Sequence, residues 1–171
     1  MKLKELLEKH QDLELTEEQE KEIKKFLNIN DNRRWKPKES QHYYFVDSGG
    51  TICKNIFIEK NESVKFRYFT NNVFKTEEET KFRLEQIKVY NELKNFADEN
   101  NDEIDWKNKN KLKFYIYCVP SSNTLAISTV SAMRDIGQIY FSSKELALQA
   151  IEKIGEDRIK KYLFNIREES K

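Results

Sequence analysis

The stretch that most constrains the fold is residues 74–100, which the sequence predicts to form one long helix between strand-like segments. Thr76 is a natural N-cap, and Glu79 stands three residues later, where its carboxylate can reach back to the cap amide. At 100° per residue the apolar positions form two stripes, because Leu84 and Ile87 lie roughly opposite a second set. That second stripe consists of Phe82, Val89, Leu93 and Phe96. A helix that is apolar on two sides needs two surfaces to pack against.

Strand signals precede this helix. Residues 43–46 and 52–58 are rich in aromatic and β-branched side chains, and the turn sequence Asp-Ser-Gly-Gly between them predicts an antiparallel hairpin. Residues 64–69 alternate cleanly and predict a further strand, with Val64, Phe66 and Tyr68 on one face. The other face of that expected strand carries Lys65, Arg67 and Phe69.

The segment after the long helix has a similar order. Residues 113–119 and 124–130 predict two more strands, and residues 138–141 predict a short third one. Ser143 is the expected cap of a helix that ends at Gly155, and residues 156–164 predict a final short helix.

The two halves contain matching landmarks. Trp35-Lys36-x-Lys38 corresponds to Trp106-Lys107-x-Lys109, and Phe74-x-Thr76 corresponds to Phe141-x-Ser143 at a slightly shorter offset. The sequence therefore predicts an α+β fold with two pseudo-repeated ββ(β)α units, about 35–100 and 106–164, which share one core. In this interpretation the two tryptophans occupy equivalent and largely buried positions, and the long helix serves both units.

Residues 2–28 predict two helices, each with a thin apolar stripe among many Lys and Glu residues. Such a pair is marginal alone and needs a packing surface. The expected organisation is an N-terminal helical hairpin over residues 1–30 and an α+β body over residues 31–171. The hairpin either covers one face of the body or serves as an arm for self-association or partner binding.

The charge balance, the cysteines and the lack of long apolar runs argue against several classes of function. Charged residues make up 36% of the chain, but 31 Lys and Arg against 30 Asp and Glu give a net charge of +1. This balance argues against a DNA mimic and against a protein that is basic throughout. Cys53 and Cys118 are isolated and lack the spacing of a zinc motif, so no metal and no cofactor are expected. The N-terminus has no signal-peptide pattern, and no apolar run is long enough for a membrane span, which predicts a soluble cytoplasmic protein.

Residues 35–164 resemble a group of uncharacterised small proteins from phages and prophages of Firmicutes. The resemblance rests on Trp35-Lys36-Pro37 with the following Tyr43-Tyr44, on the block that begins Phe74-Lys75-Thr76, on Asp105-Trp106 and on residues 139–164. It implies a phage origin and expression in the cytoplasm of a bacterial host, and it supplies no catalytic residues. By analogy, phage accessory proteins of this size often block host defence, as anti-CRISPR proteins do.

No convergent set of nucleophile, base or phosphate-loop residues is present, so the prediction is a protein that is not an enzyme. We expect it to bind and inhibit a host defence component, such as a CRISPR effector nuclease with or without its guide RNA, by protein–protein contact. The alternative is a nucleic-acid-binding accessory protein that uses the basic and aromatic run at residues 33–38. A homodimer is a further alternative. The candidate contact residues are Arg33, Arg34, Lys36, Lys38, Tyr43, Tyr44, Lys65, Arg67 and Tyr90.

Overall fold

The computed structural model describes Thr16 and residues 34–166. The predicted N-terminal helices therefore lie outside the described residues. The chain divides into two compact units, Met1–Lys36 and Pro37–Lys171, and all the strands and helices given below belong to the second unit. Within the described part of the chain, no helix has the length and apolar composition that crossing a membrane requires.

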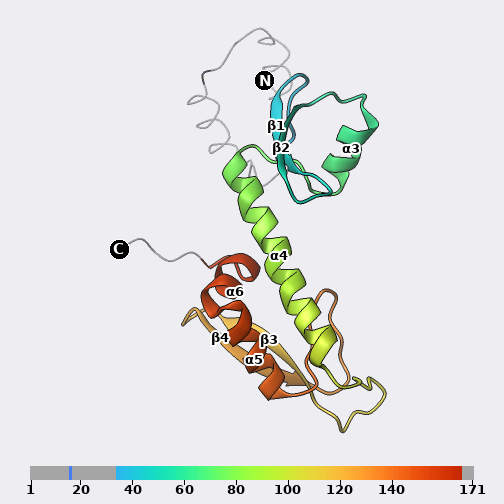
Figure 1. Cartoon of the computed structure of the whole chain (residues 1–171), viewed down its shortest axis with the longest axis vertical. Coiled ribbons are helices and arrows are strands. Elements are labelled where there is room, and N and C mark those ends of the chain that lie inside the picture. The colour runs from blue at the N-terminus through green and yellow to red at the C-terminus, as the bar shows by residue number, and fades with distance from the viewer. Residues whose placement is uncertain (1–15, 17–33, 167–171) are drawn as a thin grey trace, which may run out of the picture. The chain divides into compact units, whose positions relative to one another are not determined.

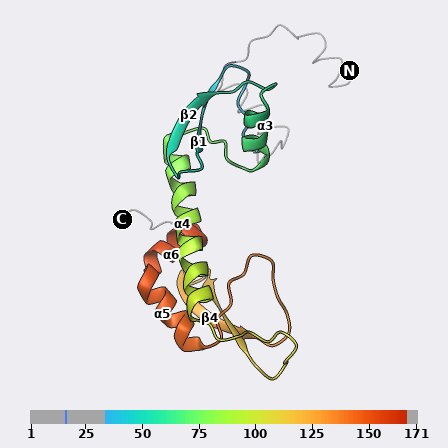
Figure 2. The ribbon, with the colours of Figure 1, turned by 45° about the vertical axis from the view of Figure 1, so that its right-hand side comes forward.

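The Pro37–Lys171 unit is a mixed α+β structure (Figure 1) with two separate antiparallel two-stranded sheets. In chain order its elements are β1 (His42–Val46), β2 (Ile52–Ile56), α3 (Glu62–Phe69), α4 (Glu77–Asn100), β3 (Lys113–Val119), β4 (Thr124–Val130), α5 (Lys144–Ile154) and α6 (Glu156–Leu163). Figures 1 and 2 agree that β1 and β2 lie beside the first turns of α4, whereas β3, β4, α5 and α6 lie along its later turns.

Helix α4 begins as the sequence predicts. The Glu79 amide donates to Thr76 Oγ1 at 3.1 Å, and Glu79 Oε2 accepts from the Thr76 amide at 3.4 Å. This capping box satisfies two amides that would otherwise lack a partner at the helix start. Glu77 and Glu78 add negative charge at the end of the helix where the dipole favours it.

The β1–β2 hairpin forms around Asp47, whose Oδ1 accepts from the amides of Gly49 at 2.9 Å and Thr51 at 2.8 Å. On the other side of β1, Tyr44 exchanges both backbone hydrogen bonds with Phe74, at 3.0 and 2.9 Å. This isolated bridge joins the hairpin to the residue two positions before the cap of α4.

The β3–β4 hairpin has an equivalent bridge. Phe114 of β3 exchanges both backbone hydrogen bonds with Phe141, at 2.9 and 2.8 Å, two positions before the cap residue Ser143. The strand predicted at residues 138–141 is thus a single bridged pair. Gly155 separates α5 from α6 with φ of 98°, a conformation that glycine adopts without steric cost.

The predicted strand at residues 64–69 is wrong, because this segment is the helix α3. Its cap is Asn61, whose Oδ1 accepts from the amides of Ser63 at 2.9 Å and Val64 at 3.2 Å. The side-chain cap holds the amides that open the helix, and this local interaction outweighs the alternating pattern. Of the three residues expected on one strand face, only Val64 is buried, and Phe66 is 66% exposed.

The main apolar core contains no residue before Val89 among the described residues, so the two sheets do not share it and the expected common core is wrong. Its buried members are Val89, Leu93, Phe96, Ala97, Ile116, Ile139, Phe141, Ala147, Ala150, Ile154 and Ile159. The first half instead buries Tyr43, Phe45, Phe57, Val64 and Val73. On α4 the second stripe is the one that packs, whereas Ile87 of the first stripe is 39% exposed.

Candidate nucleic-acid interface

Strand β3 divides its side chains between two faces of its sheet. Phe114 and Ile116 face the helices and contribute to the main core. Because successive strand residues point to opposite faces, Tyr115 and Tyr117 lie on the outer face. Four aromatic rings form a row on this outer face, and we call it the aromatic row: Tyr117, Tyr115, Tyr140 and Trp106.

Edge-to-face and tilted contacts order the aromatic row. The ring centroids of Tyr117 and Tyr115 are 6.2 Å apart, and those of Tyr115 and Tyr140 are 6.0 Å apart. Tyr140 is in turn 4.9 Å from Trp106 with an interplanar angle of 81°. Tyr140 is buried, and its hydroxyl accepts from the Asp135 amide at 2.8 Å, so it is the fixed centre of the row.

Small residues stand opposite the tyrosines on β4. Tyr115 is paired with Ser128, and Tyr117 is paired with Ala126. Neither side chain is large enough to cover a phenol ring, and Tyr117 remains 37% exposed. The outer face of this sheet therefore presents aromatic surface that can take a stacked ring.

Lys113 holds the loops at the Trp106 end of the row. Its side chain is buried, and its Nζ donates to the carbonyl oxygens of Asn108 and Ser131, each at 2.8 Å. The same Nζ lies 5.5 Å from the Trp106 ring, and Arg134 Cζ lies 5.4 Å from it. Two cationic side chains thus flank the indole, and one of them ties both neighbouring loops to β3.

Positive charge is concentrated in this part of the chain. From Trp106 to Arg134 there is no Asp or Glu, although acids make up 30 of the 171 residues. The cations of this stretch are Lys107, Lys109, Lys111, Lys113 and Arg134, and all except Lys113 are exposed. The net charge of +1 therefore conceals a basic stretch that contains most of the aromatic row.

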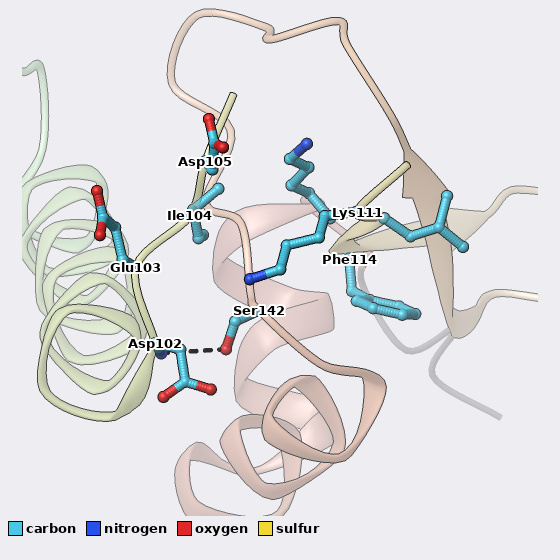
Figure 3. A pocket seen from close by; sticks show the side chains of 9 residues that line it. Asp102, Glu103, Ile104, Asp105, Lys111, Phe114 and Ser142 are labelled. Carbon is cyan, nitrogen blue, oxygen red and sulfur yellow. Dashed lines mark hydrogen bonds between the residues drawn. The ribbon is translucent and has the colours of Figure 1, made fainter. Parts of the chain in front are cut away.

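Beside this stretch lies a hollow of about 450 Å³ with acids on one side. Figure 3 shows Asp102, Glu103 and Asp105 across from Lys111 and Phe114. The loop between α4 and β3 is held near its start by a hydrogen bond, because the Asp102 amide donates to Ser142 Oγ at 3.2 Å. Within the described residues no three His, Cys, Asp or Glu side chains are placed to hold a metal ion. The lining of the hollow thus contains both the acids and Lys111 and Lys113 of the basic stretch.

The candidate contact residues from the sequence differ in how far they are exposed. Arg33 lies outside the described residues, while Arg34, Lys36 and Lys38 are exposed. Tyr90 is 37% exposed, and its hydroxyl donates to the Gly137 carbonyl at 3.4 Å.

Two of these candidates have structural roles inside the first half. Tyr43 is fully buried, so its expected role as a contact anchor is wrong; its inward position on β1 places it in the core. Arg67 lies with its Cζ 3.8 Å from the centroid of the Phe45 ring and donates to the Tyr43 hydroxyl at 3.0 Å. Tyr44 is half-buried, and Lys65 is exposed and paired with Glu62 at 2.8 Å.

The sequence predicts that Lys65, Arg67 and Phe69 share a strand face, but the segment is helix α3. Two positions along a helix correspond to a rotation of about 200°, so Arg67 points away from both Lys65 and Phe69. Lys65 and Phe69 are four positions apart and remain neighbours on one side of the helix. The expected surface therefore forms without Arg67.

The prediction that Trp35 and Trp106 are largely buried gives no indication of the aromatic row. Both Trp35 and Trp106 are half-buried, not largely buried. The acid-free run that begins at Trp106 was the signal in the sequence that could have identified this surface.

Comparisons with protein-family models, curated proteins and solved structures gave no match.

Proposed function

We propose that the protein is a non-enzymatic binding protein whose target is single-stranded nucleic acid, held on the outer face of β3 and β4. The observation that carries this proposal is the coincidence of the aromatic row with the acid-free basic stretch. Single strands bind where exposed aromatic rings stack on bases and nearby cations contact the phosphates. Tyr117 and Trp106 supply the rings in this proposal, and Lys107, Lys109, Lys111 and Arg134 supply the cations.

The test is a fluorescence-anisotropy titration of short single-stranded DNA and RNA at several salt concentrations. Stacking is worth about 1–3 kcal/mol per base, so Tyr117→Ala should weaken binding about tenfold. The triple variant Lys107→Ala, Lys109→Ala and Lys111→Ala should reduce the slope of log K against log salt by about 2, at about 0.7 per phosphate contact.

The matched control replaces three exposed lysines of the first half, Lys60, Lys65 and Lys75, with alanine. It removes the same charge from another surface and should leave the Tyr117-dependent part of the affinity unchanged. Absence of binding at low salt, or equal loss in the two triple variants, would reject the proposal.

A second candidate function is inhibition of a host defence component, such as a CRISPR effector nuclease, by protein contact in the bacterial cytoplasm. It follows from the phage-type resemblance, and the exposed apolar face of α3 favours it. Phe66 is 66% exposed and Phe69 is 81% exposed, and residues three apart on a helix are neighbours. Large exposed aromatic side chains are typical anchors of protein interfaces.

This candidate predicts that the protein protects phage in a defence-positive host and forms a stoichiometric complex with the purified effector. Phe66→Ser with Phe69→Ser should abolish both effects while leaving nucleic-acid affinity intact. Protection that survives this double variant would remove α3 as the contact surface.

We further propose that residues 35–100 and 106–164 are two versions of one ββα unit. Both units have an antiparallel hairpin whose first strand bridges to an aromatic residue two positions before a helix cap. The bridges relate Tyr44 to Phe114 and Phe74 to Phe141. Amide exchange tests the equivalence: the Phe74 and Phe141 amides should both be protected, and protection of only one would contradict it.

A further inference from the structure

The outer edge of β4 carries backbone groups whose direction follows from the bridge on β3. Phe114 gives both its amide and its carbonyl to Phe141, so these groups point away from β4. The pair Phe114 and Thr129 is therefore not hydrogen-bonded within the hairpin. Because antiparallel pairs alternate, Leu125, Ile127 and Thr129 direct their amides and carbonyls away from β3.

These six backbone groups have no hydrogen-bond partner among residues 34–166. Strand β4 reads Thr-Leu-Ala-Ile-Ser-Thr-Val, with no charged residue and no proline, in a chain of which 36% is charged. Natural proteins usually protect a sheet edge with charge, proline or a bulge, because an unprotected edge pairs with another strand. The β4 edge has none of these protections.

The corresponding edge of β2 is protected. Tyr44 exchanges both of its backbone hydrogen bonds with Phe74. By the same alternation, the amides and carbonyls of Ile52, Lys54 and Ile56 on β2 point away from β1. The Ile56 amide donates to Asn55 Oδ1 at 2.8 Å and is thereby occupied. Lys54 places a charge at the middle of the edge, with its Nζ 5.7 Å from the Tyr44 ring. The two edges thus differ although their hairpins have the same pairing.

We propose that β4 pairs with β4 of a second copy of the chain, antiparallel and about a two-fold axis at Ile127. In this register Leu125 lies opposite Thr129 of the second copy, and Ile127 lies opposite its own equivalent. Each outward amide then meets an outward carbonyl, which gives six backbone hydrogen bonds. Ala126 and Ser128 point to the outer face and are too small to obstruct the approach.

A second copy fits this edge because the two-fold axis places Ile127 opposite its own equivalent, with no charged side chain on the strand. The same arrangement at the β2 edge would place Lys54 opposite a second Lys54, and these like charges would repel. Pairing converts a two-stranded sheet into a four-stranded sheet with the order β3–β4–β4–β3, and sheets of three or more strands are independently stable where single hairpins are marginal. This proposal does not depend on nucleic-acid binding.

The test is Thr129→Pro, followed by sedimentation equilibrium across the micromolar range. Thr129 is exposed, and its amide takes no part in pairing with β3, a position where proline is tolerated on an edge strand. The dimer loses two hydrogen bonds, one from each copy, which should weaken self-association at least about tenfold. The mass should fall from twice 20.6 kDa towards 20.6 kDa.

Lys54→Pro is the matched control, because it places proline at an outward amide of the other edge. It should leave the dimer intact. Thr129→Lys is the second variant, which keeps the strand and places a charge against Leu125 of the second copy; it decides the question if Thr129→Pro does not fold. A wild-type protein that stays monomeric, a dimer that survives both Thr129 variants, or equal dissociation by Lys54→Pro would overturn the proposal.

Discussion

The two hairpins have the same backbone plan and opposite surface chemistry. Each pairs antiparallel and bridges to an aromatic residue before a capped helix. In the first half the cation of Arg67 is used internally, over Phe45 and against the Tyr43 hydroxyl. In the second half Lys113 and Arg134 flank the Trp106 ring. The segment after the second strand also differs, because it is helix α3, which carries Arg67, in the first half and a loop, which carries Arg134, in the second.

The largest expected difference between the two halves concerns the two bridged phenylalanines, Phe74 and Phe141. Phe141 is fully buried in the main core, whereas Phe74 is only half-buried. Phe141→Ala should reduce the free energy of unfolding by about 3–5 kcal/mol, because it removes a buried ring and leaves a cavity. Phe74→Ala should reduce it by less than half as much. Urea denaturation of both variants measures this, and equal losses would show that the two phenylalanine side chains contribute alike to stability.

The buried lysine provides the next test. Lys113→Met keeps the apolar volume but leaves the carbonyls of Asn108 and Ser131 without their donor. We expect a loss of about 1 kcal/mol in the free energy of unfolding, since two partly buried hydrogen bonds are removed and water can reach part of the site. Lys111→Met, at an exposed position, is the control and should change stability little. An unchanged Lys113→Met variant would mean that the loops do not need this side chain.

Substitutions at the helix caps of the two halves should cause smaller losses of stability than Phe141→Ala. Thr76 forms a reciprocal capping box, whereas the Ser143 hydroxyl accepts one bond, from the Leu146 amide at 3.2 Å. Each substitution by alanine should cost about 1 kcal/mol. Glu79→Gln retains an acceptor for the cap amide and should be milder than Thr76→Ala. Thermal unfolding followed by circular dichroism measures all three variants, and a larger loss for Glu79→Gln would contradict this account.

The smallest effect concerns an ion pair between α4 and α6. Arg158 donates to Glu92 at 2.8 Å, and this hydrogen bond lowers the pKa of the Glu92 carboxyl below its ordinary value of 4.5. A lowered folded-state pKa contributes stability above pH 4.5 that is lost as the pH falls through the folded pKa. Both side chains are about two-fifths exposed, so solvent screening limits the gain to about 0.5 kcal/mol.

Glu92→Gln should therefore reduce stability slightly at neutral pH and match the wild type well below pH 4.5. Urea unfolding at neutral pH and at a pH well below 4.5 measures this difference in stability. Asp98→Asn, which removes the partner of Lys94 within α4 alone, is the control for a pair that joins no second helix. A Glu92 effect that persists at low pH would exclude the ion pair as its cause.

Local sequence signals predicted most of the described elements. Helix α4 and its capping box followed from Thr76 and Glu79, and the β1–β2 hairpin followed from turn residues between β-rich runs. Strands β3 and β4 were predicted with their observed bounds, but their pairing was not predicted. A strand was wrongly predicted at α3 because six residues of alternating polarity match a strand pattern but are too few to exclude a short helix. Asn61 before Glu62 was the competing signal, and the cap outweighed the alternation.

The candidate interface was less predictable. The sequence shows which residues of a strand share a face, but it does not show which of the two faces is covered by helices. Tyr43 and Tyr115 both occur in aromatic strands, yet Tyr43 is buried and Tyr115 lies on an outer face. That assignment depends on which side the helices occupy, which is a tertiary property. The contact of Arg134 with Trp106 likewise joins residues that are far apart in the sequence.

Helix α4 has a kinetic consequence because both halves use it. Its 24 residues extend about 36 Å at 1.5 Å per residue, and only the turns after Val89 enter the main core. Its first turns depend on the small hairpin that packs beside them. Amides in those turns should exchange with solvent through a sub-global opening, while amides near Leu93 and Phe96 exchange only when the whole body unfolds. One continuous helix would then belong to two foldons, and the boundary between them would lie within it.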